Sequence, residues 1–249
     1  PLLARCLALA PGFTVARHNY AIVLHRQNKS QEAIAQVNML LKGEPKNPAY
    51  RALKGAAFGQ IGEYAKAIEC YQDVLKQFPN QPKAWMSYGH ALKAVGRQAE
   101  CIAAYKKSIA LAPALGEAYW SLANLKTVRF EPADIDAMKS FAAREKLADE
   151  DRYHLHFALG KAFEDDGKFA ESFEHYAAGN ALRRKNISYD ADETSDHVRR
   201  CKELFTRAFF AERSRHGDPA PDPIFIVGPP PPGPPHPPPI LANPSHVER

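Results

Sequence analysis

Apolar positions in the first three quarters of the chain recur with the spacing of amphipathic helices, and these helices follow one another in pairs. Stretches such as LLARCLALA, QVNMLLKGE and CYQDVLKQF each end at a proline. Proline lacks a backbone N–H and disfavours helix in the residue before it, so it ends each stretch. The prolines concerned are Pro11, Pro45, Pro79 and Pro113, at equal intervals of 34 residues. The sequence therefore predicts a repeated two-helix unit.

Small and large residues also return at fixed places in each unit. A small residue early in the first helix predicts close approach of two helices, and a second small residue follows in three of the units. The first set is Ala21, Gly55, Gly89 and Ala123, and the second is Ala33, Ala67 and Cys101. Large residues lie between them, among them Tyr71, Trp85 and Tyr105. Gly62 and Gly96 fall where a left-handed residue would end the first helix.

This 34-residue pattern resembles the tetratricopeptide repeat (TPR) family. The resemblance covers residues 1–183: residues 1–13 correspond to a second helix, and residues 14–113 hold three full repeats. A fourth repeat begins well at 117–123 and departs from the pattern near Arg129–Pro132, where we expect an altered helical pair. The pattern returns over 156–182. The resemblance implies an all-α helix-turn-helix solenoid, because each unit buries its apolar face only against its neighbours.

In TPR-like stacking the first helix of each unit lines a groove, which implies a protein or peptide partner. The candidate groove residues are His18, Ile22, His25, Lys83, Met86, His90, Lys93, Trp120 and Asn124, together with Val15, Ala49, Ala52, Ala56 and Glu117. Met86 and Trp120 are candidate anchors for a bound peptide. The alternative is that several of these side chains only pack or face water. A chaperone-tail clamp is not expected, because only Lys83 fits the clamp positions.

Charge and cysteine usage exclude several classes of function. Lys and Arg number 33 against 28 Asp and Glu, spread along the chain, which predicts a mixed surface and no nucleic-acid partner. The four cysteines lack metal-ligand spacing and are expected to be free thiols of a cytoplasmic protein. No apolar run approaches the roughly 20 residues of a membrane span. No histidine or carboxylate set has the spacing of a metal site, and no catalytic triad can be assigned.

Beyond residue 183 the composition changes. We expect a helical connector over 184–222, with one amphipathic helix at 198–215. Residues 223–249 contain the β-branched, apolar run Ile224–Val227, which is typical of a buried first strand of an α/β domain. Thirteen of the 21 prolines crowd into residues 219–249.

The order of repeats, connector and PIFIVG resembles the bacterial TPR–sulfotransferase proteins, relatives of the tyrosylprotein sulfotransferases. That resemblance implies phosphoadenylyl sulfate (PAPS) as cofactor, with Gly228, Pro230 and Gly233 at matching places of the phosphosulfate-binding loop. Pro231, Pro232, Pro234 and Pro235 stand where the family has arginine, serine and threonines. Proline supplies no N–H, charge or hydroxyl to a phosphate.

The sequence therefore predicts a truncated, degenerate sulfotransferase-like start that is inactive as written. The chain is expected to act as a protein- or peptide-binding scaffold. Two explanations of the proline run remain open. It is a true proline-rich linker or ligand, or it replaces native residues of an active sulfotransferase whose catalytic domain lies downstream.

Overall fold

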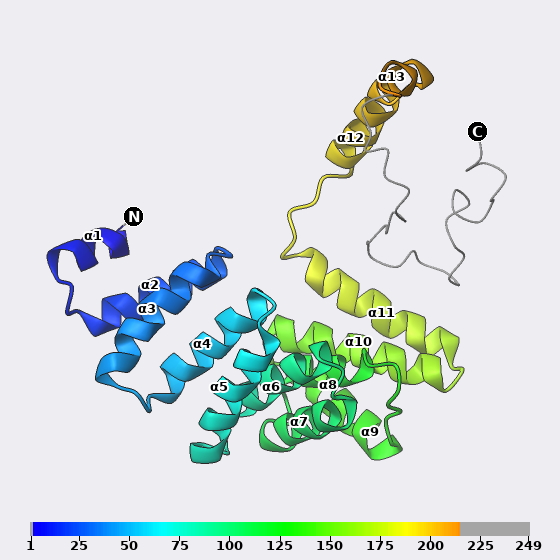
Figure 1. Cartoon of the computed structure of the whole chain (residues 1–249). Coiled ribbons are helices and arrows are strands. Elements are labelled where there is room, and N and C mark those ends of the chain that lie inside the picture. Colours follow the sequence, from blue (N-terminus) through cyan, green and yellow to red (C-terminus); the bar gives the residue numbers. More distant parts are fainter. Residues whose placement is uncertain (1, 215–249) are drawn as a thin grey trace. The chain divides into compact units, whose positions relative to one another are not determined.

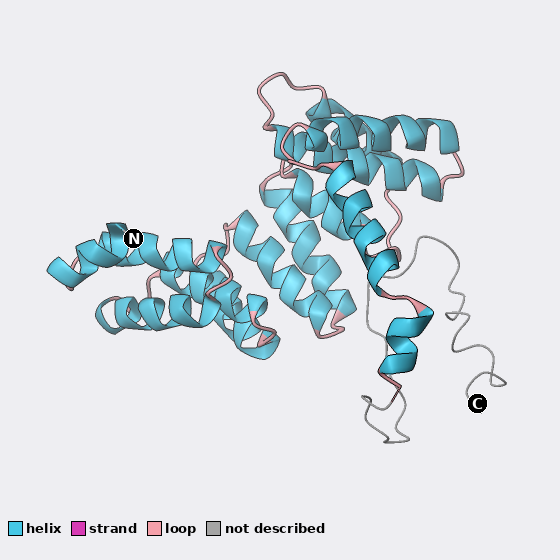
Figure 2. Cartoon of the chain, turned by 90° about the horizontal axis from the view of Figure 1, so that it is seen from above, coloured by secondary structure: helices cyan, strands magenta, loops and turns pink. Residues whose placement is uncertain are grey.

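The computed structural model describes residues 2–214, and all regular structure within that range is helical (Figures 1 and 2). The chain divides into a first unit, residues 1–188, and a second unit, residues 189–249. The all-α prediction is confirmed for the described range. The expected strand at 224–227 and the loop residues Gly228, Pro230 and Gly233 lie outside it.

The first unit consists of a leading helix followed by helix pairs. The leading helix is α1 (Leu2–Leu9), and the three full repeats are α2 (Thr14–Arg26) with α3 (Ser30–Gly43), α4 (Pro48–Gln60) with α5 (Tyr64–Gln77), and α6 (Pro82–Ala94) with α7 (Gln98–Leu111). These are followed by α8 (Gly116–Ala123), α9 (Pro132–Ala142), α10 (Asp149–Asp165) and α11 (Phe169–Arg184). Through α8 each helix packs on the next, and α4 also contacts the first helices α2 and α6, as in a solenoid.

The turns inside the three full repeats share one backbone conformation. Asn28, Gly62 and Gly96 all have positive φ, at 60°, 82° and 76°. Glycine adopts this conformation without strain, and asparagine is among the residues that tolerate it. The two glycines were predicted, whereas Asn28 at the same place in the first repeat was not.

The junctions between units are held by a second recurring device. In three successive junctions a side chain donates a hydrogen bond to the carbonyl of the proline six positions earlier, a group that no helix satisfies. The bonds run from Arg17 to Pro11 (2.5 Å), from Arg51 to Pro45 (2.8 Å) and from Trp85 to Pro79 (2.7 Å). The stop prolines therefore end one helix and also help to position the next.

Within a repeat, a glycine on the first helix receives a tyrosine ring from the second. The pairs are Gly55 with Tyr71, Gly89 with Tyr105, and Gly160 with Tyr176. A Cβ built on Gly89 would lie 2.5 Å from a ring carbon of Tyr105, and one built on Gly55 would lie 3.1 Å from Tyr71. The glycines among the predicted small residues therefore leave room for aromatic rings.

The fourth repeat is altered, as predicted. Its first helix, α8, ends at Ala123, and α9 begins at Pro132 with reciprocal bonds between Glu131 and Asp134. The helix α8 packs extensively on α10, where Gly116 donates its backbone N–H to the Asp151 carboxylate at 3.0 Å. A Cβ on Gly116 would collide with the Asp151 carbonyl oxygen, so only glycine permits this approach.

The described part of the second unit contains α12 (Ala191–Leu204) and α13 (Arg207–Glu212). The prediction of one helix over 198–215 is wrong. A break occurs at Phe205 and Thr206, where the Thr206 hydroxyl accepts a hydrogen bond from the backbone N–H of Phe209 at 3.2 Å and so begins a new helix.

Candidate peptide-binding groove

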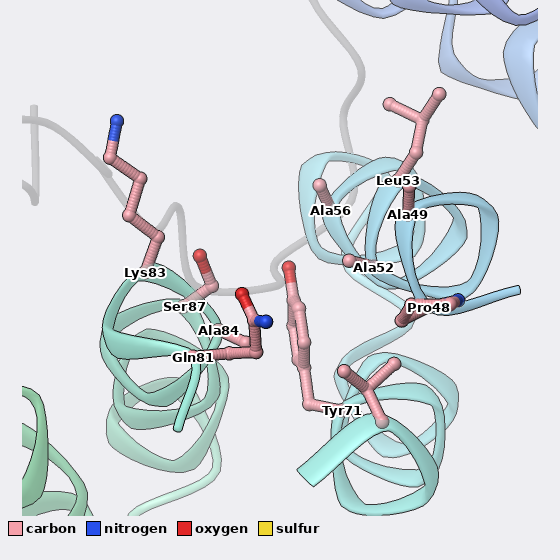
Figure 3. Close-up of a pocket in the computed structure, with 11 residues that line it drawn as sticks. Pro48, Ala49, Ala52, Leu53, Ala56, Tyr71, Gln81, Lys83, Ala84 and Ser87 are labelled. Carbon is pink, nitrogen blue, oxygen red and sulfur yellow. The ribbon is translucent and has the colours of Figure 1, made fainter. Parts of the chain in front are cut away.

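A hollow of about 490 Å³ lies between the first helices of the second and third repeats (Figure 3). One wall is α4, which presents Ala52 and Ala56, and the other is α6, which presents Lys83 and Ser87. Tyr71 rises from the second helix α5 between the two walls (Figure 3). The hollow is open to solvent and its lining is mainly apolar.

The hollow exists because one repeat carries alanine at three groove positions where its neighbours carry larger residues. Across successive repeats the first position reads Val15, Ala49, Lys83 and Glu117, the next reads His18, Ala52, Met86 and Trp120, and the third reads Ile22, Ala56, His90 and Asn124. Truncating the side chains of one helix in a stack leaves space that no neighbour fills. The small groove residues of the second repeat are therefore the local cause of the cavity.

A second hollow of about 240 Å³ continues along the same pair of helices toward Gly59 and His90. The two hollows share Ala56, Tyr71 and Ser87. Burial raises the pKa of Tyr71 to about 12, and Ser87 acts in the opposite direction. Tyr71 is therefore a neutral phenol, and it divides a groove that follows α4 and α6.

The first helices of the three full repeats carry basic residues and no acidic ones. Helices α2, α4 and α6 hold six Lys and Arg residues and no Asp or Glu. In α8 the sign changes at Glu117, whose pKa is raised by burial and by the nearby Glu150 and Asp151, while Lys83 opposes the shift. The basic character thus ends at the fourth repeat.

The predicted groove residues of the first repeat are partly engaged with neighbours. The His18 ring meets Tyr50 edge-on at 5.1 Å between centroids, and His25 Nδ1 lies 3.4 Å from Ser30 Oγ. Ile22 is half-buried. These residues do not line the hollow between α4 and α6.

In the third repeat, Lys83 lines the larger hollow and His90 the smaller one, while Lys93 is exposed. His90 Nε2 lies 3.0 Å from Ser121 Oγ. Met86 is only 7% exposed and belongs to the core shared by α5, α6, α7 and α8. The interpretation of Met86 as an anchor is therefore corrected, because its side chain packs inward.

Trp120 and Asn124 line a separate hollow of about 340 Å³. The Trp120 ring is half-buried against Phe157, with centroids 5.6 Å apart. The opposite side of this hollow is formed by Lys161, Glu164 and Tyr176 of α10 and α11. These two predicted residues are thus brought together, away from Lys83.

The sequence patterns did not identify Tyr71 as a groove residue, and they placed Leu53 and Ser87 in the groove only as chaperone-clamp positions that these residues do not fit. Tyr71 was recognised as a large repeat residue, yet it lies on a second helix and reaches the groove only because Gly55 leaves room for its ring. Ser87 comes one position after a predicted site. The signal in the sequence that could have indicated these residues was the run of alanines on the facing helix α4, because short side chains leave the residues behind them accessible.

Comparison with known proteins shows the same repeat fold. Residues 1–57 and 52–116 match the family described as tetratricopeptide repeat. The crystal structure of MamA matches with a TM-score of 0.50 at 18% identity, over 68% of this chain and 97% of that one. Nearly identical TPR-like repeats from Podosopora anserina match with a TM-score of 0.51 at 16% identity, over 70% of this chain and 96% of that one. Residues 1–116 thus match tetratricopeptide repeats, and the solenoid fold of the first unit is that of TPR proteins.

Two relatives extend the comparison of the TPR chain. The small glutamine-rich tetratricopeptide repeat-containing protein 2 of Mycosarcoma maydis is 35% identical over 81 residues, which cover 32% of this chain and 23% of that protein. An uncharacterized protein of Aquifex aeolicus (strain VF5) is 22% identical over 200 residues, covering 80% of this chain and 26% of that protein. The chain therefore spans about a quarter of the length of these relatives.

Away from the TPR groove, two histidines meet between α10 and α11. His156 Nδ1 and His175 Nδ1 lie 2.9 Å apart, so one ring donates and the other accepts. The pKa of each is lowered, by burial first and then by neighbouring cations.

Residues 2–214 contain no group of three potential metal ligands and no helix with the length and apolar character needed to cross a membrane.

Proposed function

We propose that this TPR chain is a binding scaffold that holds a segment of a partner protein in the groove along α4 and α6. The observation that carries this proposal is the open, mainly apolar hollow of about 490 Å³ between these helices. Its volume falls within the roughly 300–1,000 Å³ that is usual for ligand sites. Apolar surface that is open to water gains free energy when a partner covers it.

Selection from a random peptide library on the immobilised chain tests this function. Binders should be lost when Ala52→Met fills the hollow, because the longer side chain occupies the space beside Tyr71. The matched control is Ala65→Met, the same change at an exposed position of α5 that does not line the hollow. Absence of binders, or binders that Ala52→Met does not affect, would count against the groove as the binding site.

A second candidate function is that of the N-terminal region of a PAPS-dependent sulfotransferase-like protein. Its support is the sequence pattern from Pro223 to Ala242, with Gly228, Pro230 and Gly233 at loop positions. These residues lie outside the described range, and the proline run removes the groups that would hold phosphate. Intact-mass analysis of the natural protein across residues 228–249, followed by PAPS binding, tests this candidate. A mass that confirms the prolines would exclude activity of the chain as written.

A cytoplasmic location is part of the proposal. It is supported by the four cysteines, which are all free thiols, with Cys101 buried. Unpaired thiols persist where the environment is reducing. Expression as a fluorescent fusion in the source cell would show whether the chain remains in that compartment.

A further inference from the structure

We infer that the segment held between α4 and α6 carries a bulky apolar side chain next to acidic residues. This inference rests on the scaffold function proposed above and names the class of partner for the same groove. Two independent features of the groove support it: the shape and lining of the larger hollow, and the distribution of charge along the helices that form it.

The shape calls for a large apolar group. Ala52 and Ala56 stand opposite Ala84, with the ring of Tyr71 at the base between them (Figure 3), and Val74 is a further apolar residue of the lining. Short side chains surround a space that is wide enough for a leucine, methionine or aromatic residue together with the peptide backbone that carries it. At the position of Ala52 the next repeat has Met86, whose side chain packs against the core. A bulky side chain of the partner would fill the space that Ala52 leaves and would make van der Waals contacts of the same kind there.

The polar groups of the hollow accompany this apolar base. Ser87 belongs to α6, Gln81 directly precedes that helix, and the Tyr71 hydroxyl points up between α4 and α6 (Figure 3). Amide and hydroxyl groups can donate to and accept from a peptide backbone. They would satisfy the backbone of an anchor residue while its side chain is buried, which favours a peptide over a compact apolar ligand.

The charge calls for acidic neighbours of that anchor. Lys83 lines the hollow, extends away from its base (Figure 3), and forms no ion pair among residues 2–214. The first helices of the three full repeats, α2, α4 and α6, contain no carboxylate, and α4 and α6 among them line the groove. The second helices α3, α5 and α7 mix both signs, with acidic residues at Glu32, Glu69, Asp73 and Glu100. Within the three full repeats, basic residues without carboxylates are thus a property of the first helices, and Lys83 is the one of them that lines the larger hollow without an ion pair among residues 2–214; complementary charge sets register and partner choice.

The composition of the selected library peptides tests this inference separately from the proposed function. We expect enrichment of leucine, methionine or aromatic residues adjacent to aspartate or glutamate. Binders that depend on the groove but show basic or purely polar motifs would overturn the inference and leave the scaffold function intact. A failure to obtain any groove-dependent binder would overturn both.

Substitutions then assign each half of the motif. Ala52→Met should weaken the enriched peptide by at least about tenfold, a loss typical of a central anchor, and Ala65→Met should not. Lys83→Glu should weaken it about tenfold and should restore binding of a peptide whose acids are replaced by lysines. The control Lys107→Glu makes the same charge change on the second helix α7 and should leave both peptides unaffected. Lack of rescue by the charge-swapped peptide would remove Lys83 from the inference.

A second copy of this chain is the competing occupant. Sedimentation of the purified chain over a range of concentrations distinguishes it. Self-association that Ala52→Met abolishes would overturn the inference in favour of a dimer through this groove. A monomer that binds the enriched peptide with one-to-one stoichiometry supports it. Thermal melting of each variant verifies that the solenoid remains folded.

Discussion

The second and third repeats share the same packing frame, a glycine paired with a tyrosine, but they present different surfaces to the groove. In both, a glycine of the first helix receives a tyrosine of the second, Gly55 with Tyr71 and Gly89 with Tyr105. In the second repeat, alanines leave the groove hollow and Tyr71 borders it. In the third, the Tyr105 side chain is fully buried, and the His90 ring lies against it at 5.5 Å. The frame that stacks the repeats is therefore separable from the residues that shape the binding surface.

The two tyrosines differ accordingly in their surroundings. The Tyr105 hydroxyl is enclosed near Cys101 and Ser121 without a hydrogen bond of normal geometry, and burial raises its pKa. Tyr71 has an open hollow on each side. One ring is a structural element of the core, and the other also forms part of the site. This difference can be tested by substitution.

Replacing the two tyrosines should give the largest effect. Tyr105→Ala should lower the free energy of unfolding by about 3–5 kcal/mol, because it leaves a cavity in a closed core. Tyr71→Ala should cost less, because the space it leaves joins the open hollow and admits water. Urea unfolding followed by circular dichroism measures both. Equal losses of unfolding free energy would show that the two rings are equivalent, and the distinction between a core tyrosine and a groove tyrosine would be wrong.

Adding a methyl group to each paired glycine should give the next largest effect. A Cβ on Gly89 meets the Tyr105 ring at 2.5 Å, so Gly89→Ala should destabilise the chain by about 1–3 kcal/mol through overpacking. On Gly55 the nearest ring atom is 3.1 Å away. The higher helix propensity of alanine, about 1 kcal/mol, should offset most of that strain. The same unfolding assay decides, and a larger loss for Gly55→Ala would contradict the packing described for Tyr71.

The turns should behave alike in the two repeats and serve as an internal reference. Gly62 and Gly96 have φ of 82° and 76°, with open space where a Cβ would lie. Each substitution to alanine should therefore cost only the backbone strain, about 1–2 kcal/mol. Differential scanning calorimetry of the two variants should give matching shifts. Unequal shifts would mean that the frames themselves differ.

The smallest expected effect is a dependence of stability on pH. It arises from a histidine of the third repeat, and the second repeat has no histidine at the corresponding position. The pKa of His90 lies below its ordinary 6.5, because burial and then Lys93 disfavour the cation. As pH falls below about 6.5 the unfolded chain takes up the proton first, so stability is retained above that pH and lost below it. Melting temperatures at about pH 7.5 and about pH 5.5 should differ less in His90→Ala than in the unaltered chain. His154, His156 and His175 contribute in the same direction in both proteins, so an unchanged difference would exclude His90.

Most of the repeat frame could be predicted from the sequence, because proline and glycine act through local backbone geometry. The 34-residue prolines, the glycine holes and the turns at Gly62 and Gly96 are of this kind. Asn28 escaped notice because a left-handed asparagine resembles any polar turn residue. Met86 was misassigned because a position on the groove side of a helix does not fix the side chain direction, which the packing of α8 decides. The hollow itself required two helices and a tyrosine from a third, and no single segment encodes it.

The bonds to the proline carbonyls have a consequence for how the junctions respond to solution conditions. At two junctions the donor is an arginine, and at the third it is the neutral indole of Trp85. The donor side chain at such a junction must be long enough to reach the proline carbonyl and must carry an N–H group, but it need not be charged. Ionic strength should alter the electrostatic contribution of Arg17 and Arg51 while leaving that of the indole unchanged. A designer who extends this array could thus choose, junction by junction, whether a repeat is tuned by salt.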